Sequence, residues 1–468
     1  MIRYFKINDP YRLLVLLVFL SVGRLPWLLG DPGPTLPELD WLVAGERLST
    51  GSLLYAELWD ELGPLSALVY SAIDFVFGRS VLSYRIAGLI LYFFQTGYFN
   101  HFLRKRKAFS EYTYVPAFIY ALLGMMFFDT ITLSPQLMAL TALLGSIDSS
   151  FGIIASREQP RNLVLNTGLL LATAALFYLP IIVFAIPILT GLLLYSNLRA
   201  KGFFLLFYGI LAPFLLLWLY YYWRGETTAL QISYFHSLFR GSERTLLSLT
   251  AASAGLALPA ITTVFSVAKV LRHPGFINYQ VCLQWIIILL GIAALFIWLL
   301  WSDRSGSASV IFVAPMAFFM AQFFQILKKA WIREGLAVLI ILFIAYMNFG
   351  PRKGPASRLP DYTKSLIAVP KEYPALPSGT KVLVIGDDRS YYLHHRLATP
   401  YFKWRLSKQQ LERLDYYDNL VDIFLNFRAD MPGVIIDQHS IMPEIFSKIP
   451  SLREAYRQGA DNGVYYLK

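Results

Sequence analysis

Residues 30–63 read GDPGPTLPELDWLVAGERLSTGSLLYAELWDELG and separate two apolar parts of the chain. The stretch contains seven Asp and Glu residues and a single Arg. The apolar residues 11–29 precede it, and a helix needs about 20 mostly apolar residues to cross a bilayer. Asp31-Pro-Gly-Pro follows them in place of a small-residue cleavage site. These features predict a retained membrane anchor followed by an acidic loop.

The composition extends this interpretation to the whole chain. Of its 468 residues, 56% are hydrophobic, 16% are aromatic and 15% are charged, and the mean hydropathy is +0.51. Soluble domains carry about 25% charged residues. The composition therefore excludes an ordinary soluble enzyme and also disordered, collagen-like and disulfide-rich chains. The single cysteine, Cys282, excludes an intrachain disulfide and a cysteine-based zinc cluster. An all-α polytopic membrane protein is the predicted class.

Eleven apolar segments are the predicted membrane-spanning helices. They cover roughly residues 11–29, 81–103, 112–128, 133–154, 162–178, 180–197, 202–223, 247–270, 281–302, 308–327 and 335–349. One further apolar segment, residues 64–78, is short and carries Asp74. A charge at the bilayer centre costs at least ~2.5 kcal/mol. This segment is therefore predicted to lie in the membrane interface or to enter the bilayer only partway.

The distribution of charge predicts the orientation. With eleven spans, fifteen Lys and Arg residues and only four acidic residues fall on one side. The basic residues are Arg3, Lys6, Arg104, Lys105, Arg106, Lys107, Arg157, Arg161, Arg199, Lys201, Lys269, Arg272, Lys328, Lys329 and Arg333. The positive-inside rule makes this side cytoplasmic. We therefore expect an inner (cytoplasmic) membrane protein with its N-terminus inside and its C-terminus outside. Topology and lipid headgroups account for the net charge of +11, so no nucleic-acid partner is expected.

Two predicted outer loops are large enough to hold a site. In the first loop, residues 37–48 have the spacing of an amphipathic helix. Glu38 and Asp40 are predicted to lie in its first turn, where the helix dipole favours anions. The second loop, residues 224–246, is basic and aromatic.

The C-terminal tail is the third outer segment. The predicted organisation is a transmembrane domain over residues 1–350, a linker over 351–380 and a small α/β extracytoplasmic domain over 381–468. KVLVIGDD (381–388) and GVIID (433–437) are predicted buried strands, and residues 406–427 are a predicted helix.

Three motifs in the tail have simpler interpretations than a ligand site. Val384-Ile-Gly-Asp-Asp-Arg lacks the glycine patterns of nucleotide sites and is interpreted as a turn at a strand end. His394-His395 and Asp437-Gln-His439 are interpreted as solvated side chains rather than metal ligands.

The first loop resembles that of the GT-C superfamily of membrane glycosyltransferases, which use sugars carried on polyprenyl phosphates. The resemblance is carried by Glu38-Leu-Asp40, Gly51-Ser-Leu-Leu-Tyr55, Trp59-Asp60-Glu61-Leu-Gly-Pro64, Phe77-Gly78 and Arg85. It implies juxtamembrane helices and a catalytic carboxylate in the first loop, with a soluble C-terminal domain over the outer face. Residues 101–123 and 133–144 are similar to an uncharacterised bacterial membrane-protein family with the same layout.

The resemblance implies a lipid-linked sugar donor, with the acceptor left open among lipid, glycan and protein. Such a donor has a phosphate leaving group, so the reaction needs one base and cations that bind the phosphate. Asp40 is the first candidate for the base and Glu38 the second. The alternative acidic residues are Glu57, Asp60 and Glu61.

Arginines are the candidate ligands of the lipid phosphate, because arginine forms bidentate contacts with phosphate. They are Arg24, Arg85, Arg224, Arg240 and Arg244. Arg24 has the alternative of snorkelling to the surface or pairing with Asp31. His236 is a further candidate, either on the substrate or as a ligand of a divalent metal ion. Arg240 and Arg244 are predicted to face the same cavity as the acidic loop.

A second interpretation is non-catalytic. The chain has Glu38-Leu-Asp40 where GT-C enzymes commonly have an adjacent Asp-Glu pair. It would then be a GT-C-shaped scaffold or accessory subunit of a cell-envelope machine. A transporter is disfavoured, because transporters place polar residues and broken helices near the bilayer midplane.

Overall fold

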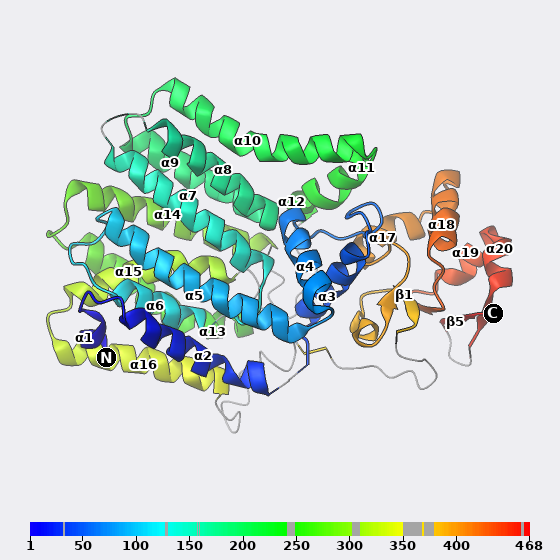
Figure 1. Cartoon of the computed structure of the whole chain (residues 1–468), viewed down its shortest axis with the longest axis horizontal. Coiled ribbons are helices and arrows are strands. Elements are labelled where there is room, and N and C mark those ends of the chain that lie inside the picture. Colours follow the sequence, from blue (N-terminus) through cyan, green and yellow to red (C-terminus); the bar gives the residue numbers. More distant parts are fainter. Residues whose placement is uncertain are drawn as a thin grey trace. The chain divides into compact units, whose positions relative to one another are not determined.

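The structure is a computed structural model that describes residues 1–30, 33–126, 130–156, 158, 160–240, 249–301, 309–349, 367–368, 379–459 and 463–468. It divides into two compact units (Figure 1). The first comprises Met1–Asp31, Leu82–Leu219 and Arg240–Ser365, and the second comprises Pro32–Val81, Tyr220–Phe239 and Leu366–Lys468. The second unit thus combines the acidic first loop with the C-terminal residues. Most of the predicted linker, residues 351–380, lies outside the described residues.

The first unit is built from helices that run alongside one another (Figure 1). They are α1 (Ile2–Phe5), α2 (Arg12–Leu29), α5 (Val81–Lys105), α6 (Val115–Gly124), α7 (Pro135–Ala155), α8 (Arg161–Phe177), α9 (Ala185–Tyr195), α10 (Ala200–Trp223), α13 (Leu249–Leu271), α14 (Asn278–Trp301), α15 (Val313–Ile326) and α16 (Ala330–Phe349). The 3₁₀ helices η2 (Leu179–Phe184) and η4 (Ser309–Phe312) lead into α9 and α15. Every predicted span corresponds to one of these helices, which confirms the predicted fold class.

Length and composition separate these helices into two groups. Among the described residues, five helical segments are long and apolar enough to cross a membrane: Arg12–Leu29, Pro135–Ala155, Ala200–Trp223, Asn278–Trp301 and Ser309–Ile326. Others are shorter than expected. Residues 112–128 were expected to span, yet α6 has only ten residues: it begins at Val115, with Pro116 in its first turn, and ends at Gly124. The side of the membrane on which each loop lies stays a prediction.

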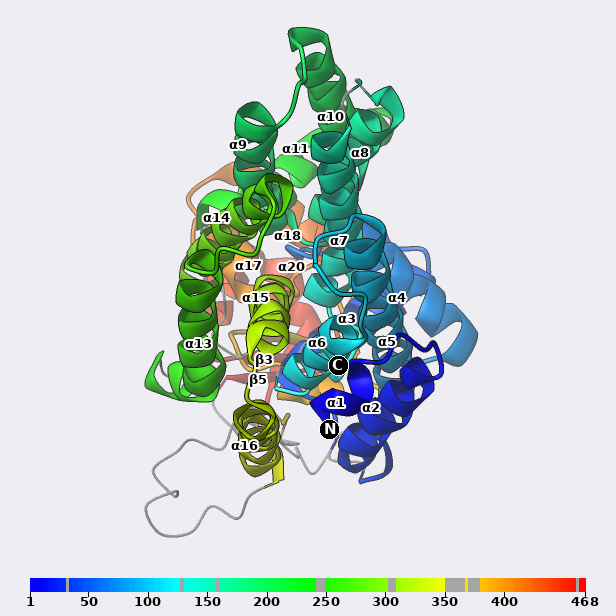
Figure 2. The same ribbon diagram turned by 90° about the vertical axis from the view of Figure 1, so that its left-hand side faces the viewer.

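The first unit has an inner and an outer layer of helices. In the most apolar 18-residue stretch of α7, 89% of the residues are buried, whereas in the corresponding stretch of α10 only 17% are buried. In Figure 2, α15 lies between α13 and α6, and it packs against both. Apolar side chains such as Phe204 and Leu216 on α10 are exposed. Such apolar surface is expected where a helix contacts lipid.

Polar side chains connect the inner helices. The Gln95 amide on α5 donates to Thr141 Oγ1 on α7 at 2.6 Å, and the Tyr120 hydroxyl on α6 donates to Gln95 Oε1 at 3.0 Å. Each such bond between membrane helices contributes about 0.6–2 kcal/mol.

The second unit contains two helices from the first loop, α3 (Leu36–Ser49) and α4 (Pro64–Phe77). The rings of Trp41 and Tyr70 stack between them, with centroids 5.7 Å apart. Leu68, Phe75 and Phe77 of α4 are exposed, as expected for the predicted interface helix. Gly78 ends α4 at φ +64°, a conformation that glycine adopts without strain. Short segments α11 (Thr227–Leu230), the π-turn η3 (Gln231–Phe235) and α12 (Ser237–Arg240) follow α10.

The C-terminal residues form the expected small α/β domain. Its elements are β1 (Lys381–Ile385), the 3₁₀ helix η6 (Ser390–Leu393), β2 (Arg396–Leu397), α17 (Trp404–Leu411), α18 (Tyr417–Ala429), β3 (Val434–Asp437), α19 (Met442–Lys448), α20 (Pro450–Ala455), β4 (Tyr456–Gln458) and β5 (Val464–Leu467). The strand order is β2-β1-β3-β5-β4. β1 pairs in parallel with β2 and β3, whereas β5 is antiparallel to β3 and β4. Both predicted strands are present, and Leu383, Ile385 and Ile435 are buried in the core.

Residues 406–427, which were predicted to be helical, are helical over most of their length. The structure has α17 and α18 with a break between them. Leu411 and Leu414 are both buried beside the break. The Asn419 amide donates to the Arg413 carbonyl at 2.8 Å and so satisfies a backbone group that the break leaves open.

Candidate functional site

The start of α3 is fixed by its own side chains. Glu38 accepts hydrogen bonds from the Thr35 backbone at 2.9 Å and from the Thr35 hydroxyl at 3.0 Å, and the Glu38 N–H donates to Thr35 Oγ1 at 3.4 Å. This is a capping box, in which both residues satisfy open N–H groups of the first turn. Because the helix begins at Leu36, Glu38 lies in its first turn and Asp40 in the next, one turn later than predicted for Asp40.

Asp40 is held by two cations of the C-terminal domain. Its Oδ2 accepts a hydrogen bond from Arg389 Nη1 and another from Lys403 Nζ, the latter at 2.7 Å. Lys403 Nζ also lies 3.7 Å from Oδ1 of Asp60. We refer to Asp40, Asp60, Arg389 and Lys403 as the charge cluster. Their side chains are 13%, 6%, 9% and 19% exposed, so the cluster is largely shielded from water.

The two carboxylates of the charge cluster are in different environments. Burial raises the pKa of Asp60 above its usual value of 3.8, and the negative charge of Asp40 adds to the effect. Lys403, Arg389 and the Glu61 N–H oppose the shift, but burial prevails. A carboxylate with a raised pKa is a better proton acceptor at neutral pH. Asp60 therefore belongs beside Asp40 among the candidate bases.

Backbone contacts fix the loop that carries Asp60. The Trp59 N–H donates to the Pro400 carbonyl at 2.9 Å, and the Lys403 N–H donates to the Trp59 carbonyl at 3.3 Å. The Trp59 ring meets the Tyr401 ring edge-on, with centroids 5.2 Å apart. Residues 59–61 thus lie alongside residues 400–405 and bring Asp60 to Lys403.

Tyrosines hold the preceding part of the same loop. Tyr55 has φ +71°, which is rare for a bulky residue and strained. Its hydroxyl donates to the Leu62 carbonyl at 2.7 Å, and its ring stacks on Tyr234 with centroids 5.9 Å apart. The Tyr221 hydroxyl donates to the Leu54 carbonyl at 3.0 Å. Tyr221 at the end of α10 and Tyr234 in the basic loop 224–246 therefore support the acidic first loop structurally.

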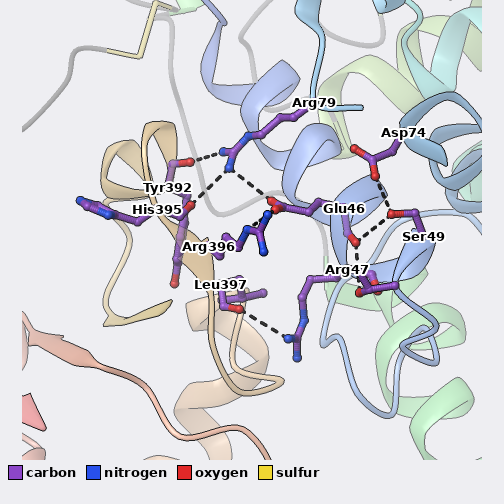
Figure 3. Close-up of polar contacts among 10 residues, drawn as sticks. Glu46, Arg47, Ser49, Asp74, Arg79, Tyr392, His395, Arg396 and Leu397 are labelled. Atoms are coloured by element: carbon purple, nitrogen blue, oxygen red, sulfur yellow. Dashed lines mark hydrogen bonds and ion pairs between the residues drawn. The ribbon is translucent and has the colours of Figure 1, made fainter. Parts of the chain in front are cut away.

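A second set of ion pairs, which we call the clamp, joins α3 to the C-terminal domain (Figure 3). Glu46 pairs with Arg79 at 3.3 Å and with Arg396 at 2.9 Å, and Arg47 pairs with Asp430 at 2.6 Å. Arg79 also donates to the Tyr392 and His395 carbonyls. Burial opposes ionisation of Asp430, yet Lys381 and Arg47 together lower its pKa.

The other predicted acidic residues of the first loop have mainly structural contacts. Glu38 closes the capping box. Glu57 accepts from the Leu53 N–H at 2.7 Å, which closes a tight turn. Glu61 lies 3.8 Å from Arg405. Among these candidates, Asp40 and Asp60 are the two that lie beside the same cation, Lys403.

The predicted phosphate ligands are divided between the two units. In the first unit, Arg85 donates to the Trp27 carbonyl at 2.9 Å. The buried Arg24 guanidinium lies 5.4 Å from the Tyr92 ring centroid and has no hydrogen-bond partner in the described part of the chain. Arg240 belongs to the same unit. Arg224 and His236 are exposed in the second unit, and Arg244 lies outside the described residues. A cavity shared by Arg240, Arg244 and the acidic loop stays a prediction.

Metal ligation by His236 also stays a prediction. Within the described residues, no group of three His, Cys, Asp or Glu side chains is placed to hold a metal ion.

Arg389 and Lys403 were not predicted from the sequence. Arg389 ends the motif Val384-Ile-Gly-Asp-Asp-Arg, which was interpreted as a turn at a strand end. β1 indeed ends at Ile385, and the ends of parallel strands are common sites for functional side chains. The position of Arg389 just after a predicted strand was the feature of the sequence that could have identified it.

Comparison with known proteins shows the fold. No family model and no curated protein sequence matches the chain. Two similar solved structures are crystal structures of ArnT from Cupriavidus metallidurans. The one bound to undecaprenyl phosphate has a TM-score of 0.57 and 13% identity, with 98% of each chain covered. The apo structure has a TM-score of 0.56 and 13% identity, with 97% of each chain covered.

The chain has the GT-C fold. This agrees with the resemblance of the first loop, and it extends the likeness from the first 100 residues to nearly the whole chain. At 13% identity the likeness to ArnT concerns the GT-C fold, and the chemistry has to be argued from the residues of the site.

Proposed function

We propose that the protein is an integral membrane glycosyltransferase. It transfers a sugar from a polyprenyl-phosphate-linked donor to an acceptor on the outer face of the cytoplasmic membrane. The GT-C fold, shared with a protein that has been crystallised with undecaprenyl phosphate, is the observation that carries the proposal. The partly buried Asp40 and the buried Asp60, which lie beside two cations, support it.

The proposed reaction needs few groups. The acceptor hydroxyl oxygen forms a bond to C1 of the sugar as the bond from C1 to the phosphate oxygen breaks. The bonding electrons leave with the polyprenyl phosphate, and the hydroxyl proton passes to a carboxylate. Phosphate is a good leaving group, so the second, acidic carboxyl group of glycosidases is not required. Asp40 is the first candidate for the base, and Asp60 is the alternative.

The direct test uses the purified full-length protein in nanodiscs with a panel of radiolabelled polyprenyl-phosphate sugars. We expect labelled sugar to pass to an acceptor present in a membrane extract, with release of polyprenyl phosphate. The proposal predicts that Asp40→Asn or Asp60→Asn abolishes this transfer. If the unmodified protein transfers no sugar from any donor of the panel, the proposal is wrong.

One observation favours the non-catalytic alternative, a GT-C-shaped scaffold of an envelope machine. Glu38 is used as a helix cap and Asp40 is bound by two cations. On this alternative, Asp40→Asn in cells leaves envelope glycans unchanged, whereas deletion of the protein alters the assembly of its partners.

A further inference from the structure

Arg389 and Lys403 bind a single oxygen of Asp40. Both cations donate to Oδ2. The guanidinium of Arg389 has five N–H donors, and its Nε is buried without a hydrogen-bond partner in the described part of the chain. A buried donor without a partner is unfavourable. The site therefore has more capacity to bind anionic oxygens than Asp40 uses.

The surroundings of these cations favour an anion. Lys403 immediately precedes α17, so the positive end of this eight-residue helix lies next to the backbone of one member of the charge cluster. Arg405, in the first turn of the same helix, lies 3.8 Å from Glu61 and is paired with it. The ring of Phe402 lies 5.6 Å from the Arg389 guanidinium and 4.9 Å from Lys403 Nζ and so keeps the two cations together. The phosphodiester of a lipid-linked sugar, with two non-bridging oxygens, fits this set of donors better than one carboxylate oxygen does.

The same unit offers a place for a lipid chain. α3 packs against β2 and η6 of the C-terminal domain, and it also packs against α4. The exposed Leu68, Phe75 and Phe77 make α4 the part of the unit that is suited to the membrane interface. Neighbouring helices lie about 8–10 Å apart. The charge cluster is therefore near the predicted membrane surface, where the phosphate of a membrane-embedded lipid lies.

We propose that Arg389 and Lys403 bind the phosphate of the lipid-linked donor and that Asp40 occupies this site only while the donor is absent. The incoming phosphate takes over the donors of both cations. Asp40 is thereby released and can accept the proton of the acceptor hydroxyl. The base is thus neutralised until the substrate that requires it has arrived. This inference rests on the proposed function.

Binding of undecaprenyl phosphate to the full-length protein in phosphatidylcholine nanodiscs tests the proposal. Arg389→Gln and Lys403→Gln should each weaken binding at least tenfold. Asp40→Asn should tighten binding about tenfold, because it removes the competing carboxylate. Arg47→Gln is the matched control: it removes another ion pair between α3 and the C-terminal domain, and binding should stay within twofold of the unmodified protein.

The outcomes separate a binding site from a structural ion pair. A structural pair would lower the thermal stability of the Asp40, Arg389 and Lys403 variants without changing their affinity, and that result would overturn the inference. Arg389→Lys keeps the positive charge but loses the planar array of N–H donors of the guanidinium group. It should bind undecaprenyl phosphate with intermediate affinity, and it serves as the test if Arg389→Gln does not fold. If the unmodified protein binds no undecaprenyl phosphate, the proposed function itself fails.

Two further ligands identify the source of the phosphate. Inorganic phosphate at millimolar concentration should compete with undecaprenyl phosphate, and it should do so better in Asp40→Asn. Nanodiscs that contain phosphatidylglycerol should not reduce binding. Equal competition by phosphatidylglycerol, with the same dependence on Arg389, would replace the proposed donor site with a general site for anionic lipids.

Discussion

Lys403 Nζ lies 2.7 Å from Oδ2 of Asp40, although 363 positions separate the two residues in the sequence. This contact makes the C-terminal domain part of the candidate site in the first loop. It also means that substitutions at Asp40 have two effects, one on chemistry and one on the cations it neutralises.

Asp40→Asn should lower turnover by about 10²–10⁴-fold, which is the usual contribution of a positioned base. It should also lower the thermal unfolding midpoint, because Arg389 and Lys403 lose a charged partner. Transfer of labelled sugar and thermal unfolding of the same preparation measure the two effects separately. Glu38→Gln is the control, since glutamine can still complete the capping box. Transfer at the unmodified rate by Asp40→Asn would eliminate Asp40 as the base.

Asp60 should make stability fall as pH rises. Its pKa is raised in the folded protein, so folding favours its protonated form. Its favourable contribution is complete below the unfolded value of about 3.8, and it is lost as the pH rises through the folded value. Asp60→Asn removes this dependence. The midpoint of the variant minus that of the unmodified protein should therefore increase between pH 4 and pH 7. A constant difference would contradict the raised pKa.

Asp430 should show the opposite pH dependence. Lys381 and Arg47 lower its pKa, so its contribution to stability is present above the unfolded pKa and is lost as the pH falls through the folded value. At pH 7, Asp430→Asn should cost about 1–3 kcal/mol, as expected when a charged hydrogen bond is removed from a half-buried site. The thermal unfolding midpoints of Asp430→Asn and of the unmodified protein should converge at acidic pH. The experiment is thermal unfolding across pH, and parallel curves would argue against the clamp.

The predicted topology can be tested without the structure. A reporter fused at Gly354 should behave as periplasmic, and one fused at Ala108 should behave as cytoplasmic. The expectation rests on the segregation of basic residues and on α4 not crossing the membrane. Both fusions should be made in the same vector, with membrane insertion checked by alkaline extraction. The reverse behaviour at either site would require a different number of crossings.

The features that sequence analysis predicted correctly are local. Each predicted span is a run of apolar residues, so the position of its helix follows from the run itself, and the run over residues 64–78 likewise predicted the helix α4. The strands of the C-terminal domain were found for the same reason. Helix ends were less accurate: α6, with Pro116 in its first turn, is shorter than predicted, and residues 406–427 form two helices with the buried Leu411 and Leu414 beside the break.

The candidate site was predicted only in part for the opposite reason. Asp40 and Asp60 could be proposed from the first loop alone, because carboxylates crowded beside a membrane are unusual. Arg389 could not, because its partner is 349 positions away and only the folded C-terminal domain brings the two together. Glu38 was ranked second as a base, and its capping role depends on where α3 begins.

The composition of the second unit has a consequence for synthesis on the ribosome. Its first part, Pro32–Val81, is translated early, whereas its last part, Leu366–Lys468, is translated last. At roughly 5–20 residues per second, Asp40 waits on the order of 20–70 s for Arg389 to be made. During that interval Asp40 and Asp60 lack Arg389 and Lys403, the cations that later lie beside them. A chain released early, before the C-terminal domain, would expose an acidic loop in a separated state that quality-control proteases can distinguish from the finished protein.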